Sequence, residues 1–314
     1  PVFDAFNPEW PIYSSNYPQS AHLAAWLVHR RTGLPWLADF RDGWTQNPAF
    51  HDPAHGLLRM AQRATERVVV RDATEVVTVS PPITRHLQTL RPHGKPAVST
   101  VWNGFDPADF ATGEGTAEPL NPGCLTLLYA GTFFGKRSPE PFLVALGILL
   151  LREPGWRGRL KVRLRCELDE DARAIVRQWK LEEVVETLPP VSFQEIVAEE
   201  KRADACLLVL ERGAGCEIMV SQKVFEYLAA KTPIYALIPE GAAEELLAEV
   251  GGATIETSTG VSEIARSLGS FLERVNDGKH PAGNAAKLAE FERRKQAAGI
   301  GELLHRAVGD KGLR

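Results

Sequence analysis

Strand-like and helix-like segments alternate along almost the whole sequence, and this alternation restricts the fold more than any other feature. Short apolar or β-branched runs are separated, in most cases, by segments of helical length. The runs lie at 36–40, 75–79, 98–102, 125–130, 161–165, 205–210 and 234–238. Strand–helix–strand units that form parallel sheets produce this rhythm. The sequence therefore predicts an α/β protein with doubly wound, Rossmann-like parallel sheets.

One segment interrupts the rhythm and predicts a domain boundary. Residues 111–123 read ATGEGTAEPLNPG and have no apolar period, as expected of a linker. About six strand signals follow this segment, enough for a complete doubly wound domain, whereas only about four precede it. We therefore expect an incomplete first domain that begins in its middle. The predicted parts are a first domain (1–112), a linker (113–123), a second domain (124–283) and a C-terminal helix (284–314) that packs back across both domains.

Composition excludes several classes of protein. A net charge of −4 with 24% charged residues gives no basic excess for a nucleic-acid partner. The longest apolar run, 142–151, is too short to cross a bilayer, and no secretory leader precedes Phe6. The four cysteines form no CxxC pair, which suits reduced thiols. We expect a cytoplasmic protein.

A phosphate-binding loop is predicted directly after the run at 125–130. Gly131 and Gly135 lie in this loop, and the adjacent cations Lys136 and Arg137 precede the next helix. Glycines let the backbone approach an anion, while a helix start supplies amides and the cations supply charge. The spacing is not that of a Walker loop. A plain strand–loop–helix junction with solvated cations is the alternative.

A second candidate loop covers residues 213–233, GAGCEIMVSQKVFEYLAAKTP. Ser221 is a good N-cap for the helix that follows, so the amides of Ser221, Gln222 and Lys223 should point out of its first turn. Glu226 shares a helix face with Lys223. The carboxylate could bind a ribose diol while the helix end binds a diphosphate. A Lys–Glu surface pair is the alternative.

Several segments, in this order, resemble a known family. The segments YAGTFFGKRSPEPFLVAL, LPPVSFQEIVAEEKRADACLLVL and SQKVFEYLAAKTPIYAL resemble the C-terminal domain of family 4-type retaining glycosyltransferases of the GT-B fold. Upstream, IYSSNYPQSAHLAAWLVHRRTGLPWLADFRDGW, VVTVSPPITRHL and TVWNGFDPADF resemble the second half of that family's N-terminal domain. The resemblance implies sugar transfer from a nucleoside-diphosphate sugar to a carbohydrate, lipid-linked or small-molecule acceptor. It implies no metal ion and no other cofactor.

The resemblance also assigns roles to residues of the donor site. Lys136 or Arg137 would bind the diphosphate, and Glu226, the final Glu of a paired-Glu motif, would bind the ribose. The other implied donor-site residues are Gly131 and Thr132 in the turn, Val191 and Ser192 near the base, and Ser221, Gln222 and Lys223 near the phosphates. The first Glu of the paired motif falls on Ile218, with Glu217 one position away.

Three residues of the first domain are candidates for catalysis. Arg41 and Asp42 follow a predicted strand, where an arginine can neutralise a leaving diphosphate and a carboxylate can accept from a hydroxyl. The alternative is an ion-pair cluster of Asp39, Arg41 and Asp42 that braces a loop. His22 could face the same cleft; otherwise it is a helix histidine whose hydrogen bonds are satisfied within the protein.

Two further patterns have weaker functional interpretations. Arg59, Arg63 and Arg67 recur at four-residue intervals and could rest on anionic lipid at the inner membrane face, or form a solvated helix face. His51 and His55 have helical metal spacing, but Pro53 separates them and no third ligand is evident, so no metal site is expected. The alternatives to a transferase are a non-catalytic glycosyltransferase relative that acts as a binding or scaffold module, and a GT-B nucleotide-sugar epimerase.

Overall fold

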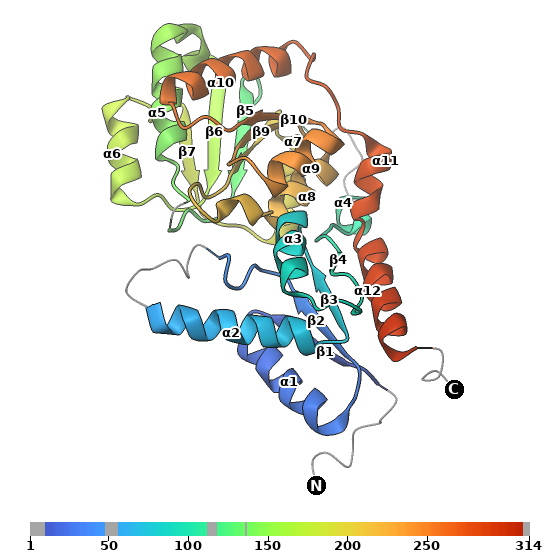
Figure 1. The fold of residues 1–314 in the computed structure, drawn as a ribbon. Helices are drawn as coiled ribbons and strands as arrows, with labels where there is room; N and C mark the ends of the chain where they lie inside the picture. The colour runs from blue at the N-terminus through green and yellow to red at the C-terminus, as the bar shows by residue number, and fades with distance from the viewer. Residues whose placement is uncertain (1–9, 48–55, 112–117, 136, 310–314) are drawn as a thin grey trace. The chain divides into compact units, whose positions relative to one another are not determined.

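The computed structural model describes residues 10–47, 56–111, 118–135 and 137–309, and its contacts divide the chain into two compact units (Figure 1). The first unit comprises Pro1–Gly104, Ala214–Met219 and Arg293–Arg314, and the second comprises Phe105–Gly213 and Val220–Glu292. The chain passes from the first unit to the second between Gly104 and Phe105, which is before the predicted linker at 113–123. Phe105 N–H donates to Phe291 O over 3.1 Å, and Lys201 Nζ donates to Phe110 O over 2.9 Å, so these residues belong to the second unit.

The first unit contains a four-stranded parallel sheet in the order β1-β2-β3-β4. Its described strands are β1 (Ile12–Asn16), β2 (Trp36–Phe40), β3 (Glu75–Thr78) and β4 (Ser99–Thr100). Its described helices include α1 (Ser20–Thr32), α2 (Gly56–Asp72), α3 (Pro81–Leu90) and α12 (Arg293–Val308). Ile12 lies opposite Trp36, and Leu37 lies opposite Glu75. The parallel sheet expected from the alternating pattern is confirmed.

Both faces of this first sheet are covered, which explains why every residue of β2 is buried. Trp36, Ala38 and Phe40 join one apolar cluster with residues of α2 and α3. Leu37 points to the other face, where it packs with Leu303 of the C-terminal helix α12. Arg306 of α12 also pairs with the buried Glu75 over 2.7 Å. The C-terminal helix therefore completes the first unit.

The second unit contains a six-stranded parallel sheet in the order β10-β9-β8-β5-β6-β7. Its strands are β5 (Leu125–Ala130), β6 (Leu160–Arg165), β7 (Val185–Leu188), β8 (Ala205–Val209), β9 (Ile234–Leu237) and β10 (Ala253–Glu256). Its helices include α4 (Pro107–Ala111), α5 (Glu140–Arg152), α6 (Glu170–Gln178), α7 (Phe193–Arg202), α8 (Gln222–Ala230), α9 (Ala242–Val250), α10 (Val261–Asn276) and α11 (Ala285–Leu288).

The second sheet is doubly wound, as predicted. The chain runs outward from β5 to β6 and β7, then returns to β8 on the other side of β5 and continues outward to β9 and β10. Helices α5, α6 and α10 cover one face, over a core that includes Leu127, Tyr129 and Phe271. Because the winding direction reverses between β5 and β8, the carboxyl ends of these two neighbours form the place where doubly wound sheets bind ligands.

Candidate functional site

A pocket of about 320 Å³ lies in the second unit at the carboxyl ends of β5, β6 and β7, beside α7 and the first turns of α8. It brings together five residues predicted from the sequence: Gly131, Thr132, Val191, Lys223 and Glu226. The two loops that contain Gly131 and Lys223 are separated by about 90 residues in the chain. The two loops were predicted to meet at the carboxyl ends of the strands, and in the structure they do so.

Gly131 and Lys223 are in direct contact. A Cβ atom added to Gly131 would lie 2.4 Å from Lys223 Cε and 2.7 Å from Nζ. The backbone of Gly131 also has φ of +145°, a conformation that glycine adopts far more readily than other residues. The glycine is therefore required twice, once by the backbone and once by the lysine that lies against it.

The helix α8 positions Lys223 and Glu226 on the pocket wall. Ser221 is its N-cap, as predicted, and accepts from Lys223 N–H over 3.4 Å. Burial lowers the pKa of Lys223, the Glu226 charge opposes this shift, and the charge of Arg137 adds to it. A half-buried lysine with weakened hydration gains more from an anionic ligand than a fully solvated lysine does.

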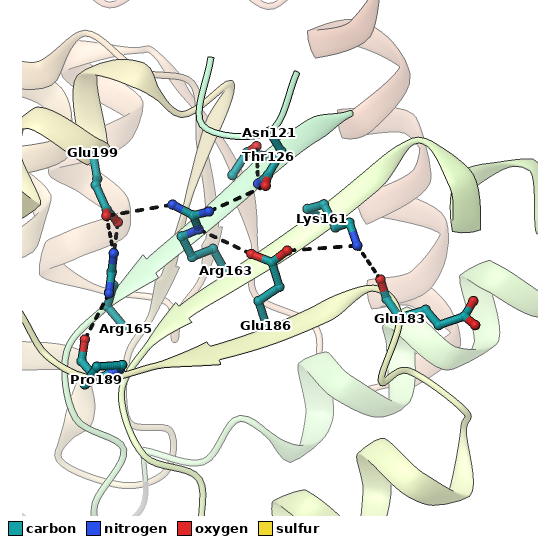
Figure 2. Close-up of polar contacts among 9 residues, drawn as sticks. All are labelled: Asn121, Thr126, Lys161, Arg163, Arg165, Glu183, Glu186, Pro189 and Glu199. Carbon is teal, nitrogen blue, oxygen red and sulfur yellow. Dashed lines mark hydrogen bonds and ion pairs between the residues drawn. The ribbon is translucent and has the colours of Figure 1, made fainter. Parts of the chain in front are cut away.

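Arg165 is a second cation of the pocket, and the sequence interpretation did not identify it. Along β6, Leu160, Val162 and Leu164 enter the core, while Lys161, Arg163 and Arg165 alternate onto the other face. Figure 2 shows that Glu199 of α7 holds Arg165: Nε donates to Glu199 Oε2 over 2.9 Å, and a second nitrogen pairs with Oε1. Arg165 also donates to Pro189 O over 3.2 Å. Its hydrogen bond to Glu199 raises the pKa of this arginine, so it is a fixed and permanent cation.

Glu200 is, after Arg165, the second charged or titratable residue of the pocket that the sequence did not predict. It lies in the last turn of α7 and is 1% exposed, and its Oε2 has no hydrogen-bond partner. Burial, together with the neighbouring Glu226 charge, raises the pKa of Glu200 to about 8, although Lys223 acts in the opposite direction. The pocket therefore contains a carboxyl group that is mostly protonated at neutral pH.

The remaining wall of the pocket is apolar and suits a flat ring. Pro190, Val191, Phe193 and Ile196 line it. Ser192, predicted to lie near the base, does not line the pocket because its side chain forms a capping box with Glu195 at the start of α7. Helix capping thus accounts for Ser192, and Val191 is the residue of this pair that faces the pocket.

Arg137 and Gln222, two of the predicted donor-site residues, do not line this pocket. Lys136 lies outside the described residues. Arg137 is not a lining residue; its guanidinium lies 5.1 Å from the centroid of the Phe134 ring, and its Nε is buried without a hydrogen-bond partner. Its charge nevertheless contributes to lowering the pKa of Lys223, so the two cations share one neighbourhood. Gln222, the first residue of α8, is also not among the lining residues.

In the first unit, Arg41 has a bracing role. Its Nε donates to the buried Asp39 Oδ2 over 2.8 Å and its Nη1 donates to Asn103 Oδ1 over 3.2 Å. Tyr13 donates to the same carboxylate of Asp39. The Asp39–Arg41 ion pair, which was expected if these residues brace a loop, is therefore present. Asp42 is exposed and does not join it; its peptide pairs with the side chain of Asn16, and partial desolvation raises the pKa of the Asp42 carboxyl.

His22 does not face a cleft, contrary to the first of its two interpretations. It is fully buried, its Nδ1 is 2.8 Å from Ser14 Oγ, and its ring centroid is 4.7 Å from that of Phe40. Burial lowers the pKa of His22 to about 4. A neutral histidine enclosed by aromatic rings is a structural residue of the first unit.

Ile218, which occupies the position of the first Glu in the resembled family's pair, is a core residue. It is 5% exposed within the main apolar cluster of the first unit, and Ser80 Oγ donates to its carbonyl over 3.1 Å. A Cβ on Gly43 would lie 2.5 Å from Ile218 Cδ1. Glu217, one position earlier, is exposed. The segment 214–219 therefore stabilises the first unit through this isoleucine.

The described residues contain neither a metal-binding cluster nor a membrane-spanning helix. Across residues 10–47, 56–111, 118–135 and 137–309, no cluster of three His, Cys, Asp or Glu side chains is arranged to hold a metal ion. His51 and His55 lie outside these ranges. In the same part of the chain, no helix combines the length and the apolar character needed to span a bilayer.

Comparison with known proteins agrees with this architecture. Residues 5–103 match the family described as glycosyl transferase 4-like domain. A D-inositol 3-phosphate glycosyltransferase from Kineococcus radiotolerans is 27% identical over 268 residues, which cover 78% of this chain and 60% of that protein. The chain therefore spans about 60% of the length of this curated relative.

Solved structures extend the likeness to nearly the whole chain. A UDP-forming trehalose-phosphate synthase from Burkholderia xenovorans superposes with a TM-score of 0.70 at 12% identity, covering 98% of this chain and 76% of that one. A sucrose-phosphate synthase from Thermosynechococcus elongatus gives a TM-score of 0.69 at 14% identity, covering 94% and 73%. At these identities the likeness concerns the fold, and it confirms the expected GT-B class.

Proposed function

We propose that this chain, a GT-B protein of the family 4-like glycosyltransferase type, transfers a sugar from a nucleoside-diphosphate sugar to an acceptor. The pocket of the second unit would bind the donor. The observation that carries the proposal is the contact between Gly131 and Lys223 at the switch point of the sheet, with Glu226 one helical turn away. A backbone without a side chain, a cation and a carboxylate meet there, as recognition of a diphosphate and a ribose requires.

Each part of the pocket has a role in this proposal. Lys223, with Arg137 nearby, would bind the diphosphate and stabilise the charge that develops on it as the sugar leaves. Glu226 would accept hydrogen bonds from the ribose hydroxyls. The apolar wall that includes Val191 and Phe193 would pack against the base. Together these contacts would supply donor binding and leaving-group stabilisation from the chain's own residues.

The names of the relatives suggest a narrower substrate class. The trehalose-phosphate synthase is described as UDP-forming, and the inositol phosphate enzyme acts on a phosphorylated polyol. We therefore place a uridine diphosphate sugar first among the donors. A phosphorylated small molecule or a carbohydrate comes first among the acceptors.

A thermal-shift and turnover experiment tests the proposal. UDP, GDP, ADP and dTDP at millimolar concentration should each be compared with the matching nucleoside, because a ligand that binds only the folded protein raises the melting temperature. At least one diphosphate should raise it well above its nucleoside, and the Glu226→Ala variant should lose that rise. Glu245→Gln, on the exposed side of α9, is the matched control. The absence of a shift for all four diphosphates would refute the donor-site assignment.

The position of Ile218 favours one alternative function. Because this core residue replaces the first Glu of the resembled pair, a protein that binds the nucleotide without transferring sugar is the second candidate. Release of the nucleoside diphosphate from its sugar, measured with and without acceptors, separates the two. Acceptor-dependent release supports the transferase. Binding without release at any acceptor supports the non-catalytic module, and turnover of the donor alone to an isomer supports an epimerase.

We also propose that helix α2 contacts the inner face of the membrane from the cytoplasm. Leu57, Leu58 and Met60 are 85%, 53% and 68% exposed, and Arg63 and Arg67 are exposed further along the same helix. Exposed apolar side chains beside cations suit an anionic lipid surface. Co-sedimentation with vesicles should depend on anionic lipid and be lost in Leu57→Ser, Met60→Ser. Equal binding to neutral vesicles, or none to either, would refute the proposal.

A further inference from the structure

Glu200 has surroundings that the donor-site proposal does not explain. The face of α7 that turns inward includes Ile196 and Val197, and Glu200 occupies the next position of that face. Thr232 Oγ1 donates to the Glu200 carbonyl over 2.6 Å, so the end of the helix is fixed. The side chain is 1% exposed and lines the pocket, and Oε2 has no hydrogen-bond partner. A buried carboxyl oxygen with no partner at a pocket wall is costly unless a ligand satisfies it.

Charged and titratable groups face Glu200 from three neighbouring elements. From α8 come Lys223, Glu226 and Tyr227; from β8 comes Cys206; from β6 comes Arg165. Arg165 is already engaged by Glu199, so it does not satisfy Glu200. On α7 itself, Lys201 and Arg202 donate to Phe110 O and Glu118 O. Among these charges Lys223 favours the carboxylate form of Glu200, while Glu226 and burial favour the neutral form.

We propose that Glu200 is a further donor-binding residue that works in its protonated form, donating a hydrogen bond from Oε2 to an oxygen of the bound nucleoside diphosphate. The inference rests on the proposed function and adds a residue to that site. An ionised Glu200 beside Glu226 would place two negative charges at the pocket that must receive an anion. A neutral Glu200 removes one charge and supplies a donor to the ligand.

The proposal predicts that nucleotide affinity depends on pH in a specific direction. Burial raises the pKa of Glu200 to about 8 in the free protein, and a bound diphosphate would raise it further. Nucleotide affinity should therefore be constant below that pH. Above it, the affinity should decrease with a slope that approaches about tenfold per pH unit. The terminal phosphate of the ligand loses its second proton with a pKa of about 6, so the charge of the ligand stays constant over the pH range in which Glu200 titrates.

Two substitutions separate the hydrogen bond from the titration. Glu200→Gln keeps a donor of the same shape and does not titrate, so its affinity should match wild type at pH 7 and stay within about twofold up to pH 9. Glu200→Met keeps the approximate volume without a donor, so its affinity should be about five- to tenfold lower at pH 7 and equally flat. Calorimetry with UDP, GDP, ADP and dTDP provides these affinities, and Glu245→Gln is the control that should behave as wild type.

Lys223 could produce a similar fall at high pH, because burial lowers its pKa. Two measurements distinguish it from Glu200. Lys223→Arg keeps its charge over the whole range, so the fall should persist in this variant and vanish in Glu200→Gln. Titration in buffers of different ionisation enthalpy should show proton uptake on binding near pH 8.5 for wild type and none for Glu200→Gln.

The outcomes fall into separate classes. Binding with the predicted fall and proton uptake, both abolished by Glu200→Gln, supports the proposal. Binding that is independent of pH in wild type, or a fall that persists in Glu200→Gln, refutes the role of Glu200 and leaves the donor site intact. No binding of any of the four diphosphates at any pH refutes the donor site and this role together.

Discussion

Replacement of Gly131 by alanine should weaken nucleotide binding by displacing Lys223. The added Cβ would lie 2.4 Å from Lys223 Cε, at the far end of a flexible side chain, so the lysine will move. The φ of +145° adds a backbone cost of about 1–3 kcal/mol to the free energy of folding. Separately, loss of one hydrogen bond between Lys223 and the bound anion should reduce the binding free energy by about 1.5–3 kcal/mol, or roughly 10- to 150-fold in affinity.

A double-mutant cycle with Lys223→Ala tests this mechanism. If Gly131→Ala acts through the lysine, the double variant should lose no more affinity than Lys223→Ala alone, so the two losses will not add. Gly123→Ala is the matched control, because Gly123 has φ of +84° with no atom within 4 Å of the added Cβ. This control should lose folding stability and retain affinity.

The assay is calorimetric titration with a nucleoside diphosphate, together with denaturant unfolding of each variant. Unfolding separates the backbone cost from the binding cost, since only the former appears without ligand. Fully additive losses of affinity, or unchanged affinity in a folded Gly131→Ala, would show that the contact between Gly131 and Lys223 does not position the cation for the ligand.

Three further predictions concern the pocket. Glu226→Ala should weaken nucleotide binding by roughly 1–3 kcal/mol in calorimetry, and unchanged affinity would place Glu226 outside the site. Arg137→Ala should reduce affinity for a diphosphate more than for its nucleoside, whereas equal losses would indicate an effect on folding. Folding raises the pKa of Glu200 from 4.5 to about 8, so the stability of wild type relative to Glu200→Gln should fall as pH rises between these values, by about 1.4 kcal/mol per pH unit in urea unfolding. A difference in unfolding free energy between the two proteins that does not change with pH would contradict the raised pKa of Glu200.

The alternation of strands and helices was readable from the sequence, and the pocket loops were readable with it. Ranges such as 36–40 and 125–130 coincide with β2 and β5, because fully buried parallel strands are continuous apolar runs. The strands β1, β7 and β10 were not among the strand ranges expected from the sequence. Ser14, Ser15 and Asn16 make β1 polar, and only one of the four residues of β7 is buried, so their apolar signal is weak.

The missed site residues depend on tertiary contacts. Glu200 belongs to the run EEKR, which looks like a solvated helix face, yet it shares the buried face with Val197. An acidic residue on the apolar face of a helix was the available signal. Arg165 alternates with core residues of β6, and only its contact with Glu199 shows that it is held at the pocket. Two interpretations of His22 stayed open at the sequence level, because a single histidine gives no indication of whether it is buried; the structure shows it buried.

Hydrogen–deuterium exchange with and without a nucleoside diphosphate tests whether the pocket of the second unit is the donor site. Bound ligand should slow exchange in three separate segments that meet only in the folded pocket: residues 130–132, 191–200 and 222–227. UDP, GDP, ADP and dTDP should be compared at saturating concentration. Protection of all three segments by at least one of them would locate the donor site. Protection confined to other segments, or no protection with any of the four diphosphates, would contradict the assignment of this pocket as the donor site.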